Sequence, residues 1–102
     1  MTIVAEREFM IIEGAELRPA RVLVFAPEKI SDNEWKCEYR LVGFSKDRAR
    51  KAYGVDSYQA LYLALKILAT EIAITDEYKG GKLTLFGKAD FDINEMMGFL
   101  PA

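Results

Sequence analysis

The chain has 102 residues, of which 51% are hydrophobic and 29% charged, and its net charge is −2. This length predicts a single domain, residues 1–102, whose core needs no metal or disulfide. The acidic balance argues against a general nucleic-acid-binding protein, which is usually basic. No apolar stretch approaches the roughly 20 residues that span a bilayer, and the first residues lack the pattern of a signal peptide, so no membrane contact is expected.

Two strands are predicted first. The apolar run of residues 9–12 indicates a strand within residues 2–13. Residues 20–26 are apolar on both alternating sets and rich in valine, which is typical of a central strand. Pro19 and Pro27 bracket this second segment, and proline is tolerated at strand ends but not inside a ladder.

A third strand follows over residues 35–44, after a polar segment, residues 28–34, that is expected to form a hairpin loop. Its side chains alternate in the manner of a strand with one buried and one solvated face. One set is Trp35, Cys37, Tyr39 and Leu41, and the other is Lys36, Glu38 and Arg40.

Residues 48–53 are compatible with two structures. Alanine, arginine and lysine favour a helical turn. We prefer a fourth strand, because residues 45–47 form a turn-like segment and pairing back onto residues 36–42 sets basic side chains near Glu38.

A long helix is predicted next. Gly54 interrupts the preceding element, Asp56 or Ser57 can cap the first turn, and Gln59 supports a capping box. The helix is expected to end near residues 76–78, so that about 20 residues make a rod of about 30 Å, long enough to cross a sheet.

A short fifth strand is predicted over residues 82–87, and an apolar tail over residues 90–100. The predicted fold is therefore α+β: an antiparallel meander of about four strands with one long helix packed across one face, plus the short fifth strand and the apolar C-terminal tail.

The helix has two apolar stripes at 100° per residue. The stripe expected to face the sheet contains Tyr58, Leu61, Leu65, Leu68 and Ile72, with Ala64 at its edge. The second stripe contains Ala60, Leu63, Ile67 and Ile74. The fifth strand and tail, a second copy of the chain, or a different partner can cover this second stripe, which makes it the candidate interface.

Two segments of the chain resemble a family of small uncharacterised bacterial proteins. The first runs from Trp35 to Tyr39 and has tryptophan and cysteine two residues apart. The second runs from Ala52 to Leu65, and in it a Gly-Val-Asp turn leads into a Gln-Ala-Leu helix. The resemblance covers about a third of the chain. It implies a domain of unknown function, a bacterial cytoplasmic origin and a sheet-plus-helix fold, and it implies no activity. Antitoxin-like and immunity-like domains are similar in architecture alone.

The residue types give little support to catalysis. The chain has no histidine, which removes the commonest general base and metal ligand. Its single cysteine, Cys37, cannot form an internal disulfide, which suits a reducing cytoplasm, and its place on an apolar strand face is typical of a core residue.

The acidic pairs and glycines are also better explained without chemistry. Asp90 with Asp92, and Glu6 with Glu8, lack the further oxygen ligands of a calcium loop. The pair Gly80-Gly81 precedes a strand, whereas a phosphate loop leads into a helix. We predict no catalytic residue, no cofactor and no metal.

One basic cluster is present: Lys46, Arg48, Arg50 and Lys51, with Lys36 and Arg40 beside it. As a candidate basic patch it can bind RNA or an acidic partner, but Glu38 and Asp47 interrupt it and a solvated charged face explains it as well. The sequence therefore favours a non-catalytic binding or assembly protein that forms a homodimer through the second stripe. The alternatives are binding of RNA or an acidic protein by the basic patch, or an immunity- or antitoxin-like role.

Overall fold

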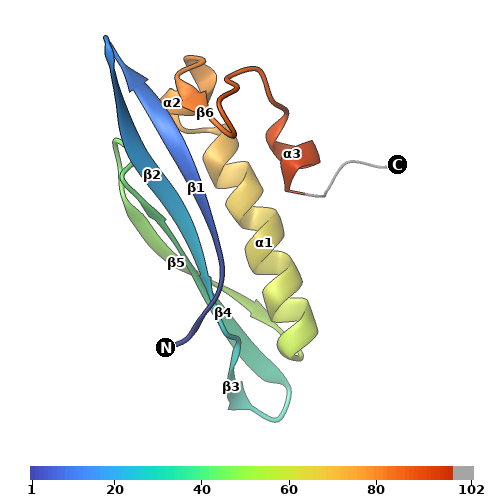
Figure 1. The fold of residues 1–102 in the computed structure, drawn as a ribbon. Coiled ribbons are helices and arrows are strands. Elements are labelled where there is room, and N and C mark those ends of the chain that lie inside the picture. Colours follow the sequence, from blue (N-terminus) through green and yellow to red (C-terminus); the bar gives the residue numbers. More distant parts are fainter. Residues whose placement is uncertain (98–102) are drawn as a thin grey trace.

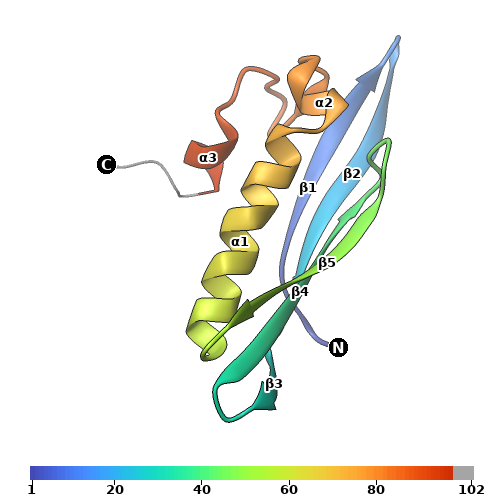
Figure 2. The same ribbon diagram turned by 180° about the vertical axis from the view of Figure 1, so that it is seen from behind.

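A computed structural model of the chain describes residues 1–97, without the side chains of Asn94 and Glu95. Within the described residues, an antiparallel sheet of six strands carries one long helix across one face, and two short helices lie on the same side (Figures 1 and 2). The predicted α+β fold is confirmed. The elements are β1 (Ile3–Glu13), β2 (Glu16–Phe25), β3 (Glu28–Ser31), β4 (Glu34–Val42), β5 (Arg48–Gly54), α1 (Ser57–Ala73), α2 (Asp76–Lys79), β6 (Leu83–Thr84) and α3 (Ile93–Met96).

The meander consists of β1, β2, β4 and β5, each antiparallel to the next. β6 returns after the helices and pairs with β1. On β4, Tyr39 pairs with Val24 of β2 on one side and with Arg50 of β5 on the other. β5 therefore lies at one edge of the described sheet and β6 at the other.

β3 corrects the sequence prediction, which assigned all of residues 28–34 to a hairpin loop. Glu28 and Lys29 pair with Lys36 and Trp35 of β4, so that the connecting turn is shorter than predicted. All four residues of β3 are exposed. Because none of them contributes to the core, the strand has no apolar alternation by which the sequence could have revealed it.

The predicted alternation of β4 is confirmed. Cys37, Tyr39 and Leu41 are buried beneath α1, whereas Glu38 and Arg40 lie on the opposite face of the sheet. There the Glu38 carboxylate accepts a hydrogen bond of 2.6 Å from Arg40 Nε. This contact holds the Arg40 guanidinium 4.8 Å from the centre of the Phe25 ring and shields that ring from water.

Residues 48–54 form a strand, as preferred from the sequence, and not a helical turn. The register sets Lys51 directly opposite Glu38. It also places Arg48 and Arg50 on the same face as Tyr39 and Leu41, the face that α1 covers.

The start of α1 follows the predicted capping pattern. Asp56 accepts a hydrogen bond of 2.8 Å from the backbone N–H of Gln59, and the Gln59 side chain accepts one of 2.8 Å from the backbone N–H of Val55. One first-turn donor, the Gln59 N–H, and the Val55 N–H just before the cap are satisfied in this way. Asp56 is therefore a structural cap.

The helical run divides into two helices, where one was predicted. α1 ends at Ala73, and Thr75 begins α2 by accepting a hydrogen bond of 3.2 Å from the backbone N–H of Tyr78. The same hydroxyl donates to the Ile72 carbonyl at 2.7 Å. Thr75 thus satisfies groups of both helices, which explains why the chain turns here instead of continuing the rod.

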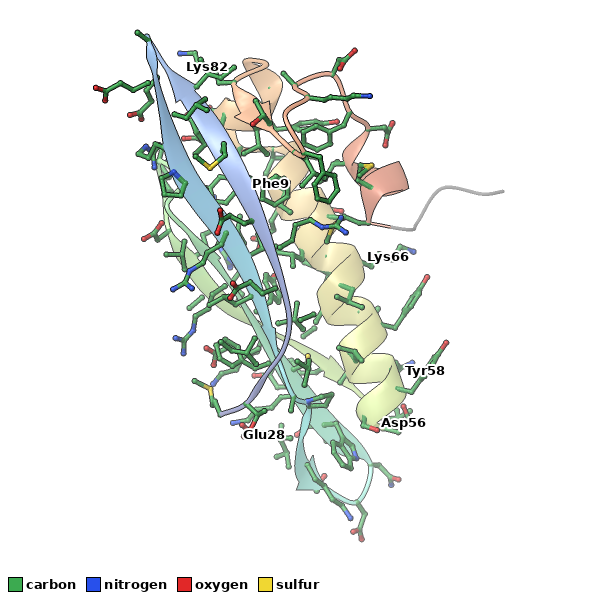
Figure 3. All side chains as sticks on the ribbon, viewed as in Figure 1. Phe9, Glu28, Asp56, Tyr58, Lys66 and Lys82 are labelled. Carbon is green, nitrogen blue, oxygen red and sulfur yellow. The ribbon has the colours of Figure 1, made fainter. Side chains whose placement is uncertain are left out.

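The small residues of α1 face the sheet. Ala60, Ala64, Leu68 and Ile72 are fully buried. Tyr58, predicted to lie on the sheet, is 78% exposed and points away from it, as does Lys66 (Figure 3). The prediction for Tyr58 is wrong because α1 approaches the sheet through alanines, and this rotates the large side chains of the first turn outward.

The end of the described chain closes over one flank of α1. β6 contains two residues instead of the six predicted, and a turn joins Leu85 to Lys88. Phe91 stacks on Phe9, with ring centres 6.2 Å apart, and Ile93 is buried. The apolar residues Phe99 and Leu100 of the predicted tail lie outside the described residues.

Candidate functional site

Two isoleucines are exposed on one side of α1 and its C-terminal cap. Ile67 is 40% exposed, and Ile74, at the C-terminal cap of the helix, is 52% exposed. Leu63, one turn before Ile67, is half-buried. We call these three residues the flank stripe. The fourth residue predicted for this stripe, Ala60, is fully buried against the sheet and is not part of any exposed surface.

The flank stripe lies on the side of α1 that borders β5. Ala60 touches Gly54 at one end of β5, and Glu71 contacts Arg48 near the other end. Leu63, Ile67 and Ile74 follow next around the helix on that side, because successive residues turn by 100°. Figure 2 shows β5 ending beside the N-terminus of α1.

The described part of the tail covers the opposite flank of α1. Leu65 lines a groove together with Met96 and Met97. Ala69, one turn after Leu65, is fully buried. Within residues 1–97 the tail therefore leaves the flank stripe uncovered.

The edge of β5 lies next to the flank stripe. β5 pairs with β4 along one edge, and no strand among the described residues pairs with its other edge. Ala49, Lys51 and Tyr53 are exposed along it. An edge of this kind presents unpaired backbone N–H and C=O groups that can accept another strand.

The structure divides the predicted basic patch. Arg48 Nη1 lies 3.3 Å, and Arg50 Nε 3.1 Å, from the same oxygen of Glu71 on α1. The Glu71 side chain is only 10% exposed. Lys46 in the β4–β5 loop and Lys51 on the outer face of β5 are exposed. The four cations therefore do not form one continuous exposed surface.

A second buried carboxylate fixes the loop that carries Lys46. Glu77 of α2, which is 7% exposed, accepts hydrogen bonds from the Ser45 backbone N–H at 2.9 Å and from the Ser45 hydroxyl at 3.3 Å. Together, Glu71 and Glu77 attach the helical layer to β5 and to the preceding loop.

Two further polar groups belong to the core. Cys37 is fully buried, its Sγ lies 3.2 Å from the Phe25 carbonyl oxygen, and burial raises the pKa of its thiol. Burial first, and the neighbouring Glu71 carboxylate second, raise the pKa of Tyr39 to about 12. Both groups are neutral at physiological pH, which makes neither of them an activated nucleophile or base.

The predicted acidic pairs are exposed. Asp90 and Asp92 lie on the surface, and Glu6 forms an ion pair of 3.6 Å with Arg21 on the outer face of the sheet. Among the residues whose side chains are described, no three histidine, cysteine or acidic groups lie together in a way that could hold a metal ion.

Sequence reasoning missed a groove on the tail side of α1. Val22, Val24 and Leu68 form its floor, and Arg7 of β1 stands at its rim. Arg7 Nη1 donates a hydrogen bond of 2.6 Å to the Met96 carbonyl. The signal was present in β1, since Arg7 shares the alternating set of Phe9 and Ile11, both of which are buried.

Comparisons with known proteins identify a family and no activity. The family model that matches is a domain of unknown function, DUF6968, over residues 5–94. No curated protein and no solved structure matches the chain. In the part of the chain that the structure describes, no helix has the length and apolar character needed to cross a membrane.

Proposed function

Because the chain belongs to the DUF6968 family, whose description states no activity, we propose a function from its surface: it is a non-catalytic assembly protein that forms a homodimer. The interface consists of the flank stripe and the adjacent edge of β5. The observation that carries this proposal is the exposure of Ile67 and Ile74 directly beside an unpaired strand edge. Complete removal of such a side chain from water contributes about 1.5–3 kcal/mol of favourable free energy.

The two parts of this surface are compatible with one symmetric contact. α1 lies over β4 and β5. The β5 strand of a second copy would pair with this edge at a distance of about 4.8 Å. If the two-fold axis is perpendicular to the sheet, the α1 helices of both copies lie on the same face of the joined sheet. The two α1 helices then lie roughly 8–10 Å apart, the normal distance for packed helices. Leu63 and Ile67 of each copy meet between them.

The charges on β5 are compatible with this contact in one register. The Arg50 side chain, although 56% exposed, contacts Glu71 of its own chain. Lys51 lies exposed along the edge of β5, and two Lys51 side chains directly opposite each other would repel. A register centred on Ala52 instead sets Lys51 opposite Tyr53 of the second copy, where its ammonium can lie on an aromatic ring. The reducing cytoplasm of a bacterium suits such a protein, because Cys37 is buried and free.

Sedimentation equilibrium tests the proposal. We expect the wild-type chain to be dimeric at high protein concentration, and the double variant Ile67→Asp, Ile74→Asp to be monomeric. The control is Tyr58→Asp, which adds one aspartate at an exposed site on another side of α1 and should remain dimeric; the single variant Ile67→Asp, which carries the same added charge as this control, should be largely monomeric.

Thermal unfolding followed by circular dichroism accompanies the measurement. Equal melting of all these proteins at a dilution at which each is monomeric shows that the changes act on association and not on the fold. A wild-type chain that stays monomeric near millimolar concentration contradicts the proposal, and so does a double variant that dimerises as strongly as the wild type.

A further inference from the structure

The groove on the tail side of α1 combines an apolar floor with one cation. Val22 and Val24 of β2 and Leu68 of α1 are each at most 2% exposed, and Leu65, Met96 and Met97 form the walls. The cavity measures about 190 Å³. Since an apolar cavity of about 150 Å³ accepts benzene, this groove has room for a short aliphatic chain.

Arg7 is the unusual residue here. It points to the covered face of the sheet, opposite Val22 in the register of β1 and β2. Its described contacts are neutral: the Met96 carbonyl oxygen at 2.6 Å and the Met97 sulfur at 3.9 Å, both from Nη1. Among the side chains that the structure describes, no carboxylate lies within ion-pair distance of Arg7; Glu6, which also lines the groove, pairs with Arg21 at 3.6 Å. A half-buried guanidinium whose described partners are all neutral is costly, and an anion would stabilise it.

We propose that this groove binds an apolar monocarboxylate of short to medium chain length. The aliphatic chain lies on Val22, Val24 and Leu68, and the carboxylate binds Arg7. A guanidinium has five N–H donors in a planar fork that matches a carboxylate, and the described contacts use Nη1 alone. Methionine side chains are flexible and polarizable, so Met96 and Met97 can adapt to the chain.

The four methionines provide the readout. In a protein labelled with ¹³C-methyl methionine, octanoate should shift the methyl signals of Met96 and Met97. Met1, which is 72% exposed, and Met10, on the opposite alternating set of β1 from Arg7, should not respond. Two control ligands each contain one part of octanoate: octanol lacks the charge, and acetate lacks the aliphatic chain.

We expect octanoate to bind at least about tenfold more tightly than octanol, since a hydrogen bond to a charged group contributes that much. Acetate should give no shift at Met96 or Met97. Arg7→Gln should remove the preference for octanoate over octanol, and Arg7→Lys should keep part of it. Lys36→Gln, which removes a cation from the other face of the sheet, away from the groove, should keep all of it. An unchanged Met10 signal shows that each variant is folded.

Three results would overturn the proposal. The first is that octanoate leaves Met96 and Met97 unshifted. The second is equal affinity for octanol and octanoate, which would make the groove an apolar void. The third is binding only after removal of residues 98–102, which would assign the groove to the chain's own end. The groove lies on the opposite flank from the flank stripe, so none of these results depends on dimerisation.

Discussion

Gly54 sets how closely α1 approaches the sheet. A Cβ atom at this position would lie 2.4 Å from the Ala60 backbone nitrogen and 2.8 Å from the Gln59 carbonyl carbon. Both are backbone atoms of the first turn of α1, so they cannot move aside independently. Glycine at position 54 and alanine at position 60 together permit the contact that seats the helix.

Gly54→Ala is therefore expected to lower the free energy of unfolding by about 1–3 kcal/mol, the usual cost of forcing an extra carbon into a packed site. Urea denaturation measures this change. Val55→Ala, at the next residue, which is 59% exposed, is the control and should change stability by less than about 0.5 kcal/mol. Equal stability of Gly54→Ala and the wild type would show that the helix is not seated by this contact.

The same residues show what the sequence reveals at this scale. A helical wheel ranks Tyr58 and Leu61 above Ala60 and Ala64 because it weights side chains by hydrophobicity. The fold instead selects small side chains where two backbones meet, and that depends on the partner residue Gly54. Ile67 and Ile74 were placed on the second stripe from the sequence, and both are exposed there. Asp56 was predictable as a cap because capping depends only on neighbouring residues.

At the scale of elements, Glu71 connects α1 to β5. One of its oxygens receives both Arg48 and Arg50, while the other is buried and has no hydrogen-bond partner among the described residues. A buried carboxylate depends strongly on its cations, because removal of a partner leaves an uncompensated charge. The arginines of β5 therefore have a structural role at Glu71, and binding by the candidate basic patch stays a prediction.

Replacing Arg50 by alanine should lower the free energy of unfolding by about 1–2 kcal/mol. The lower part of the range for buried charges applies because Arg50 is partly exposed and Arg48 still neutralises Glu71. Lys51→Ala, one residue along the same strand, is the matched control, since Lys51 lies on the solvated face; it should cost less than about 0.5 kcal/mol. If urea denaturation shows the same loss of stability for Arg50→Ala and Lys51→Ala, the contact between Arg50 and Glu71 does not stabilise the fold as predicted.

Elements were predictable where burial repeats along the sequence. β4 was found from its alternation of period two, and β5 from the pairing that its turn permits. β3 was missed because all its side chains are exposed and only backbone pairing defines it. The division between α1 and α2 depends on the two hydrogen bonds of Thr75, which have no counterpart in an apolar pattern.

The described residues form three surfaces of different character: the outer face of the sheet and the two flanks of α1. The outer face of the sheet carries ion pairs between neighbouring strands, such as Glu28 with Lys36. One flank of α1 is covered by the tail and contains the groove at Arg7. The other flank exposes the flank stripe beside the edge of β5. We infer that this last surface is where a second copy binds.

Chemical cross-linking between single cysteines tests this claim most directly. Cys37 is fully buried, so an introduced cysteine is the accessible thiol of the folded chain. We predict that Ile67→Cys, treated with a short bismaleimide, gives a covalent dimer in high yield, and that Tyr58→Cys gives little. The yield for Ile67→Cys should fall on dilution below the dimer dissociation constant. Equal yields at the two positions, or no covalent dimer from Ile67→Cys at high concentration, would contradict an interface between copies at the flank stripe.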